Sequence, residues 1–310
     1  MSVVFTFVSP ASTDRSNAAA ERHAVGSRVT PASAWRAGFQ SWLSDGQSNS
    51  LGVVDRAVAG EIEQQQFLLT HGAGELDPVT AARRLAALQL RHGGRIALRV
   101  PARGLVDTDR QPSHIAFWRR IDEYLTLLKR LWANEKPIDH EGPFYSVVGG
   151  FVPRKGARGI AVPIRMAGLS GTALNVAGKH ADVFELAAMS PDEARLLASR
   201  VRAAAARHGR QGKVRFALPV VFDAAGQETA VSGQSILSQK PAQAALQLLS
   251  FVDAGVSEFM VRGIGTADGL DAFEHVVSFV QNSSSRREAA WAASAGIAAG
   301  RFDMVPVGSH

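Results

Sequence analysis

The chain has 310 residues, 46% of them hydrophobic and 20% charged, which is typical of a soluble globular protein with a large core. It contains no cysteine, which excludes disulfides, thiolate metal sites and a cysteine nucleophile and is compatible with a cytoplasmic location. The net charge of +6 is scattered, without a basic stripe interleaved with aromatics, and no apolar run approaches a membrane span, so neither nucleic acid nor membrane is an expected partner.

Strand-like and helix-like segments alternate along the chain. Strands are predicted at residues 3–8, 51–54, 66–70, 95–100, 163–166, 181–186, 214–222 and 258–262. Helices are predicted at residues 32–44, 79–90, 117–132, 172–178, 191–208, 241–254 and 267–280. Residues 9–31 and 133–159 interrupt the alternation and are expected to be a long loop and an excursion between elements.

The clearest single unit covers residues 66–100, which predict a strand, a helix and a second strand. Asp77 can cap the helix, and Pro78 suits its first turn, where no amide donor is needed. Leu85, Leu88 and Leu90 are expected to face inward. Two glycines end the helix before the buried strand IALRV, which gives a β-α-β unit of a parallel sheet.

The whole pattern predicts an α/β protein whose strands close into a (β/α)8 barrel. Eight strands favour the barrel over an open doubly wound sheet, which usually has fewer. Residues 1–282 are expected to form one domain, and residues 283–310 a C-terminal tail that is loose or partly helical, in which residues 286–299 could form a helix. Ser190 and Glu193 form a predicted capping box that fixes the start of one helix.

Four segments resemble the flavin-dependent luciferase-like monooxygenases, especially their alkanesulfonate monooxygenase branch. They are DPVTAARRLAALQLRHGGR, IDEYLTLLKRLW followed by IDHEGPFY, IRMAGLSGTALNVA followed by HADV, and AGVSEFMVRG. Together they cover most of residues 50–280 in the family's order. The resemblance implies a shortened luciferase-like TIM barrel that binds reduced FMN and uses molecular oxygen to oxidise a small organic substrate. It also implies a separate flavin reductase and a homodimer or homotetramer.

Residues 167–172, AGLSGT, are the best candidate for an anion site. They follow a strand and open a helix, so free amides and the positive end of the helix dipole point to one place. The resemblance assigns the FMN phosphate to this turn, and therefore to Gly168, Leu169, Ser170 and Gly171. A plain helix N-cap is the alternative interpretation.

Further candidates follow other strands. His71 and Arg262 are candidate catalytic residues, although His71 could equally be a loop histidine and Arg262 an inward charge that needs a partner. Arg103, His114 and Trp118 are candidate cofactor-binding residues, with a solvated arginine, a helix cap and a core aromatic as the respective alternatives. No metal site is expected.

The chain also departs from the family pattern. Pro219 and Val221 occupy the positions of an Arg-x-His pair, and Phe117 and Trp118 those of an arginine and a phosphate-binding tyrosine. The long insertion after the seventh strand is missing, because residues 224–240 form only a short connection. Two functions therefore stay open. One is an FMNH2-dependent monooxygenase. The other is a non-catalytic flavin-binding protein or a partner subunit that stabilises an active paralogue.

Overall fold

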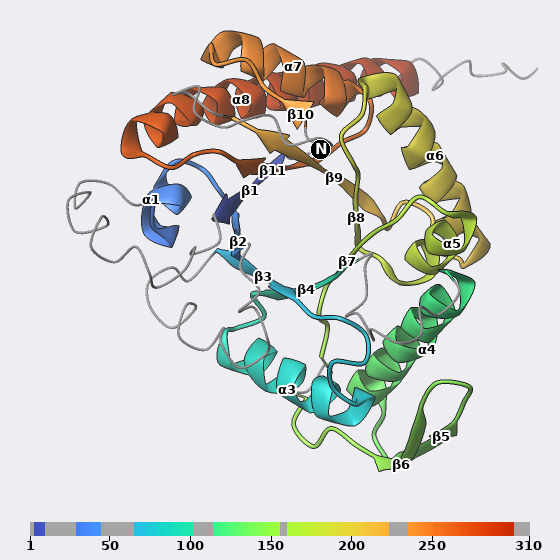
Figure 1. The fold of residues 1–310 in the computed structure, drawn as a ribbon. Helices are drawn as coiled ribbons and strands as arrows, with labels where there is room; N and C mark the ends of the chain where they lie inside the picture. The colour runs from blue at the N-terminus through green and yellow to red at the C-terminus, as the bar shows by residue number, and fades with distance from the viewer. Residues whose placement is uncertain are drawn as a thin grey trace, which may run out of the picture.

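The computed structural model describes residues 3–9, 29–44, 65–101, 114–155, 160–222 and 235–300. Its centre is a parallel β-barrel, seen along its axis in Figure 1. The ring runs β9-β11-β1-β2-β3-β4-β7-β8, and β8 pairs with β9 to close it. The ring strands are β1 (Val4–Ser9), β2 (Ser41–Ser44), β3 (Gln66–Thr70), β4 (Ile96–Val100), β7 (Ile164–Ala167), β8 (Val183–Glu185), β9 (Arg215–Val221) and β11 (Glu258–Arg262).

Helices surround the ring, so the (β/α)8 barrel expected from the alternation is confirmed. They are α1 (Pro31–Arg36), α3 (Pro78–Arg91), α4 (His114–Ala133), α5 (Gly171–His180), α6 (Pro191–Arg207), α7 (Pro241–Asp253) and α8 (Ala267–Gly300). The two-residue strand β10 (Ser235–Ile236) pairs with β9 beyond the end of β8. None of the helices in the described part of the chain is long and apolar enough to cross a membrane.

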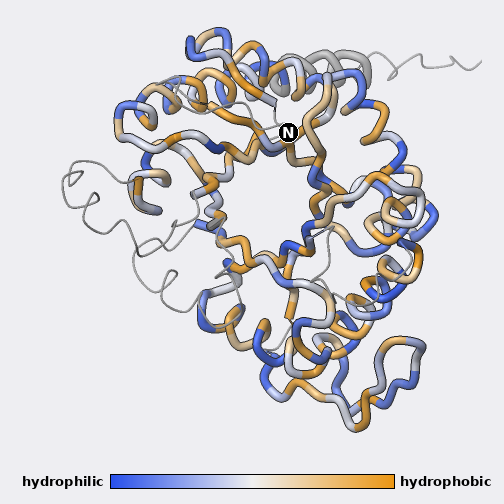
Figure 2. The backbone as a smooth tube through the Cα atoms, in the orientation of Figure 1, coloured by the Kyte–Doolittle hydropathy of each residue, from blue (hydrophilic) through white to orange (hydrophobic). Residues whose placement is uncertain are grey.

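The strands bury both faces, as parallel strands under helices must. Their outward side chains join the helices in one large apolar core that includes Phe5, Phe7 and Phe259. Their inward side chains form a separate apolar cluster inside the bore: Val8, Leu43, Leu68, Ala97, Val183, Ala217 and Met260. Figure 2 shows hydrophilic positions interrupting the hydrophobic ring where β4, β7 and β8 adjoin. The bore is therefore filled partly by apolar side chains and partly by charged ones.

The helix predicted over residues 32–44 is wrong in its second half. Trp35, Phe39 and Leu43 are spaced four residues apart, which imitates one face of a helix. The helix ends at Arg36, because Gly38 turns the chain at a φ of 89° and lies against Val277, where a Cβ would come within 2.7 Å of Cγ1. Residues Ser41–Ser44 then form β2, the second strand of the barrel. The strand predicted at 51–54 lies outside the described residues.

The β-α-β unit over residues 66–100 is confirmed with one correction. Asp77 caps α3 by accepting hydrogen bonds from the amides of Val79 and Thr80. Leu85 and Leu88 are buried in the barrel core, but Leu90 is 46% exposed, because it falls on the solvent side of the helix with the arginines.

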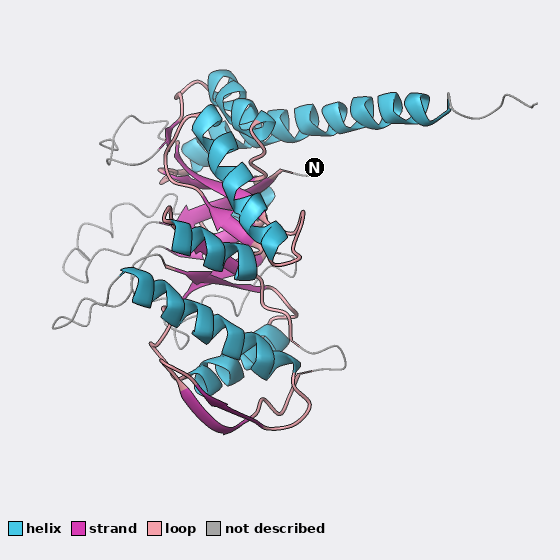
Figure 3. Ribbon diagram, turned by 90° about the vertical axis from the view of Figure 1, so that its right-hand side faces the viewer, coloured by secondary structure: helices cyan, strands magenta, loops and turns pink. Residues whose placement is uncertain are grey.

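Two segments lie beyond the regular alternation. The expected excursion after α4 contains an antiparallel hairpin of β5 (Ile138–Glu141) and β6 (Ser146–Gly150), which packs on α3. The helix expected at 286–299 is the continuation of α8, which runs unbroken through residue 282 and extends past the barrel in Figure 3. The capping box of Ser190 and Glu193 at the start of α6 is confirmed.

Candidate functional site

The turn between β7 and α5 stands at the carboxyl end of the strand ring, where ligand sites of such barrels are built. Ser170 is the N-cap of α5, and its hydroxyl accepts a hydrogen bond from the amide of Ala173. The first amide bonded along the helix to Ser170 is that of Leu174, so the amides of Gly171 and Thr172 precede the hydrogen-bonded turns. These two amides and the helix dipole favour an anion at this end of α5.

Two features make the space in front of this turn suitable for a ligand. A Cβ added at Gly171 would meet no atom within 4 Å, so the position opens onto free space. Leu169 is 59% exposed beside it and offers apolar surface. Ser170 and Gly171 thus lie at the start of a helix that follows a strand, and the N-cap bond alone also accounts for Ser170.

Gly168 has a structural reason of its own to be glycine. Its φ is 137°, and a Cβ there would lie 2.8 Å from Cζ2 of Trp118 and 2.7 Å from Cβ of Ala173. Trp118 is buried beneath the turn, and its indole N–H donates to Nε2 of His114 at 3.2 Å. His114 must then carry its proton on Nδ1. Gly168, Trp118 and His114 therefore support the turn from behind, while Arg103 lies outside the described residues.

His71 does not face the bore. It follows β3, whose inward residues are Gln66, Leu68 and Thr70, so strand alternation turns His71 outward. The side chain is 1% exposed, with Nδ1 3.0 Å from Oε2 of Glu75 and Nε2 2.8 Å from Oη of Tyr124. Burial lowers the pKa of His71, although Glu75 opposes this shift. With both ring nitrogens bonded, the structure places His71 as a link between the β3–α3 loop and α4.

The bore holds a chain of ionic contacts that the sequence interpretation did not assemble. Arg165 Nη1 and Nη2 lie 3.0 Å and 2.8 Å from the two carboxylate oxygens of Glu258, which also accepts a 2.5 Å hydrogen bond from Thr6. Nε of Arg165 donates to Glu185 Oε1 at 3.1 Å. Nε of Arg99 donates to the same carboxylate at 2.8 Å and 3.1 Å. We call Thr6, Glu258, Arg165, Glu185 and Arg99 the bore network.

The bore network extends from the amino ends of the strands to their carboxyl ends. Glu258 begins β11 and Glu185 ends β8, so the contacts climb toward the carboxyl rim, where Arg99 is the most exposed member at 27%. Burial raises the pKa of Glu185, but Arg99 and Arg165 outweigh burial and hold it below its usual value. Burial likewise lowers the pKa of Arg165, but Glu258 and Glu185 outweigh it and raise the pKa. Glu185 and Arg165 therefore keep their charges at neutral pH.

The remaining inward positions at the rim differ in character. Arg262, at the end of β11, is half-buried on the same face as Glu258 and Met260 and is already engaged in an interaction of its own. Pro219 and Val221 are the inward residues nearest the carboxyl end of β9, and both side chains are apolar. Among the described residues, no group of three His, Asp or Glu side chains could hold a metal ion.

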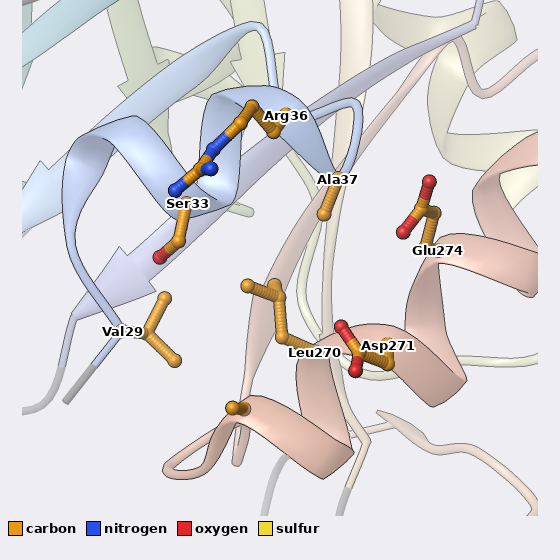
Figure 4. A pocket seen from close by; sticks show the side chains of 8 residues that line it. Val29, Ser33, Arg36, Ala37, Leu270, Asp271 and Glu274 are labelled. Carbon is orange, nitrogen blue, oxygen red and sulfur yellow. The ribbon is translucent and has the colours of Figure 1, made fainter. Parts of the chain in front are cut away.

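A cleft of about 310 Å³ lies elsewhere, between α1 and the start of α8 (Figure 4). Ser33 and Arg36 line it from α1, and Asp271 and Glu274 line it from α8. Both helices lie outside the strand ring, so this cleft is separate from the bore. We assign the candidate site to the barrel mouth, because the α5 turn and the exposed end of the bore network meet at that rim.

The sequence does carry a signal for the individual charges of the bore network, although not for their pairing. Arg99 interrupts IALRV, Arg165 interrupts IRMA, and Glu185 and Glu258 end or begin apolar strands. A charge on the inner face of a closed barrel must find an opposite charge. The prediction applied this argument to Arg262 alone, and it did not count strand parity at His71.

A closed parallel barrel surrounded by helices defines a (β/α)8 protein, and the N-terminus of α5 and the charged end of the bore network lie at its carboxyl rim. The luciferase-like monooxygenase family model matches residues 57–305 of this chain. The protein belongs to the luciferase-like monooxygenase family, whose description makes its broad class an oxidoreductase.

Individual relatives are more distant. A sulfoquinovose monooxygenase of Agrobacterium fabrum (strain C58 / ATCC 33970) is 32% identical over 152 residues, which are 46% of this chain and 37% of that protein. The match therefore spans well under half of that relative. An F420-dependent secondary alcohol dehydrogenase, solved with an F420-acetone adduct, superposes with a TM-score of 0.74 at 16% identity, covering 90% of this chain and 99% of the other. A riboflavin lyase, solved with modified FMN and riboflavin, gives a TM-score of 0.72 at 14% identity, covering 92% of each chain. These two structures share the fold.

Proposed function

We propose that the protein is a monooxygenase that uses reduced FMN, delivered by a separate flavin reductase, to oxidise a small organic substrate at the barrel mouth. The observation that carries the proposal is the open N-terminus of α5 at the carboxyl rim of a family barrel. The family is described as monooxygenases, and solved relatives of the fold hold FMN or F420 adducts.

The described residues fit a flavin phosphate at this turn. The amides of Gly171 and Thr172 and the hydroxyl of Ser170 would bind the phosphate, with Leu169 beside it and His114 and Trp118 supporting the turn from behind. Reduced FMN supplies the electrons that activate oxygen when it is bound. The chain holds its phosphate, lines part of the mouth with carbon at Pro219 and Val221, and keeps a positive charge there at Arg99.

Gly171→Asp tests the phosphate position. Aspartate at the first turn of a helix is compatible with folding, and Gly171 has free space, so the variant keeps the barrel while placing a like charge against the phosphate. We expect its FMN affinity to fall at least about tenfold, since like charges at hydrogen-bonding distance cost more than about 1.4 kcal/mol. FMN fluorescence quenching measures the affinity. Gly171→Asn is the matched neutral control.

Riboflavin, which lacks the phosphate, provides a second control. Its binding should be equal in Gly171→Asp and Gly171→Asn, because the added charge acts on the phosphate alone. Unchanged FMN affinity in Gly171→Asp would move the phosphate away from α5. Gly168→Asp is unsuitable, because its φ of 137° and its contact with Trp118 would disturb the turn itself.

A second candidate function is a flavin-binding partner subunit without turnover, as a homodimer, a homotetramer or a heterodimer with a paralogue. It is favoured by the apolar inward side chains of Pro219 and Val221 on β9 and by the ring of His71, in which both nitrogens are already hydrogen-bonded. Oxygen consumption with FMN, a reductase, NADH and candidate substrates separates the two functions. Substrate-dependent consumption supports the enzyme, while tight FMN binding without it supports the partner subunit.

A further inference from the structure

We propose that Arg99 binds the carboxylate or sulfonate of a small organic substrate, and that the bore network holds it in position to do so. The inference rests on the proposed function, because it names the class of molecule that the barrel mouth accepts. It begins with the geometry of one guanidinium. Only Nε of Arg99 bonds to Glu185, at 2.8 Å and 3.1 Å from its two oxygens.

The other edge of the Arg99 guanidinium is available for a ligand. In the described part of the chain, neither Nη1 nor Nη2 has a hydrogen-bond acceptor, yet the side chain is 27% exposed. Arg99 lies on the inner face of a closed barrel, near the carboxyl end of β4, so its exposed part must open into the mouth. The Nη1 and Nη2 pair matches two oxygens of one carboxylate or sulfonate group.

The lower part of the bore network keeps this edge in place. Glu185 is only 5% exposed and forms an ion pair with Arg165. Arg165 is 1% exposed and forms a second ion pair with Glu258. An arginine on an open surface samples many rotamers, whereas Arg99 is hydrogen-bonded to a buried carboxylate that Arg165 also binds. A ligand that binds a preorganised donor pays less ordering entropy.

A neighbouring hydroxyl strengthens the assignment. Thr70 on β3 is paired in register with Arg99 and shares its inward face and partial exposure. An oxygen anion bound to the Nη edge would have this hydroxyl as a further donor. Pro219 and Val221 lie on β9, elsewhere around the barrel mouth, and their side chains are apolar. A substrate with an apolar chain and one anionic group could therefore contact both kinds of surface.

The test uses hexanoate, hexane-1-sulfonate and hexan-1-ol as probes on the full chain without flavin, with saturation-transfer NMR to detect weak binding. We expect both anions to bind and hexan-1-ol to bind at least about tenfold more weakly, since the alcohol cannot form a charge-assisted pair. Arg99→Met should lower the affinity for the anions at least about tenfold, and Arg99→Lys should give an intermediate loss, because it keeps the charge but not the paired donors.

Arg195→Met is the matched control, because Arg195 is also paired with a carboxylate but lies on the surface of α6. It should bind the probes as the native chain does. If Arg99→Met fails to fold, Arg99→Lys and Thr70→Val still decide the matter. Equal binding of hexan-1-ol and hexanoate, or native anion affinity in both Arg99→Lys and Thr70→Val, would overturn the inference.

Flavin titrations of the same variants separate this inference from the proposed function. If Arg99→Lys weakens FMN binding but not riboflavin binding, Arg99 faces the cofactor phosphate, and its assignment to substrate is overturned. If the anions bind through Arg99 and neither flavin binds the native chain, the inference stands while the proposed function fails. If FMN binds and the anions ignore Arg99, the reverse holds.

Discussion

Asp122 on α4 ties two helices together through one carboxylate. Its Oδ1 lies 2.7 Å from Nζ of Lys179 and 2.7 Å from Nε2 of His180, both at the end of α5. Burial raises the pKa of Asp122, but the hydrogen bonds from His180 and Lys179 outweigh it and lower the pKa from 3.8 to about 2. The folded state therefore binds the Asp122 proton less readily than the unfolded chain does.

Linkage turns this shift into a pH dependence. A carboxyl group whose pKa is lowered by folding stabilises the fold above its unfolded pKa, and that contribution is lost as the pH falls from about 4 to about 2. Asp122 is 34% exposed, so solvent screening reduces the contribution to about 1 kcal/mol. We predict that Asp122→Asn lowers the free energy of unfolding by about 1 kcal/mol at pH 6 and by almost nothing near pH 2.

Urea unfolding across that pH range measures the difference. Asp192→Asn removes the exposed partner of Arg195 and should change the free energy of unfolding little at any pH. A gap between Asp122→Asn and the native chain that stays constant from pH 6 to pH 2 would contradict the titration argument. Burial lowers the pKa of His180 and Asp122 opposes that shift, so the variant also alters the His180 contribution, and the titration of Asp122 is read between about pH 4 and about pH 2.

At the scale of single elements, the sequence was informative where local signals agreed with tertiary packing. β3 and β11 have the predicted bounds, and α6 starts at its predicted capping box. β2 was missed, because four residues are too few to show alternation and the spacing of Trp35, Phe39 and Leu43 satisfies a helix equally well. Its strand pairing with β1 and β3 depends on residues far away in the sequence.

The candidate site was predictable to a similar degree. The α5 turn could be located, because a strand, a glycine and an N-cap serine are local signals. The bore network was not assembled, because its members come from β1, β4, β7, β8 and β11, and only closure of the barrel brings them together. Residue identity could suggest that each charge needs a partner, but not which charge it meets.

The packing of α5 against α6 depends on one small residue. A Cβ at Gly178 would lie 2.6 Å from the backbone carbon of Ala204 and 2.7 Å from the amide nitrogen of Ala205, so the two helices touch through backbone here. We predict that Gly178→Ala destabilises the protein by about 1–2 kcal/mol, because overpacking costs more than the improved helix propensity returns. Urea unfolding measures it.

Gly171→Ala is the control from the same helix, since its Cβ would meet nothing within 4 Å. It should leave the free energy of unfolding within about 0.5 kcal/mol of the native value. Equal stability of both alanine variants would mean that α5 and α6 can separate at little cost.

At the scale of the whole molecule, one apolar core runs beneath all the described helices. It includes Phe5 on β1, Leu128 on α4, Val201 on α6 and Val276 on α8, and the strand ring closes without an open edge between them. The separate apolar cluster in the bore is formed by the inner faces of the same strands, so both clusters depend on one closed ring, which favours a single cooperative unit.

We therefore predict one unfolding transition. Tryptophan fluorescence reports on Trp42 beside β1 and on Trp118 and Trp132 in α4, while far-ultraviolet circular dichroism reports on all the helices. The two probes should give the same urea midpoint, because the elements share one core. Midpoints that differ between the probes would indicate that part of the barrel unfolds by itself.

The part of the bore network below Arg99 also blocks one end of the barrel to small molecules. Glu258, Arg165 and the carbon ring around them fill the lower bore, so a molecule that reaches Arg99 can arrive and depart only through the carboxyl rim. A flavin bound at that rim would enter through the same opening. When two ligands use one opening, the one bound lower must enter first and leave last, so the proposed flavin and substrate positions would together impose an order of binding.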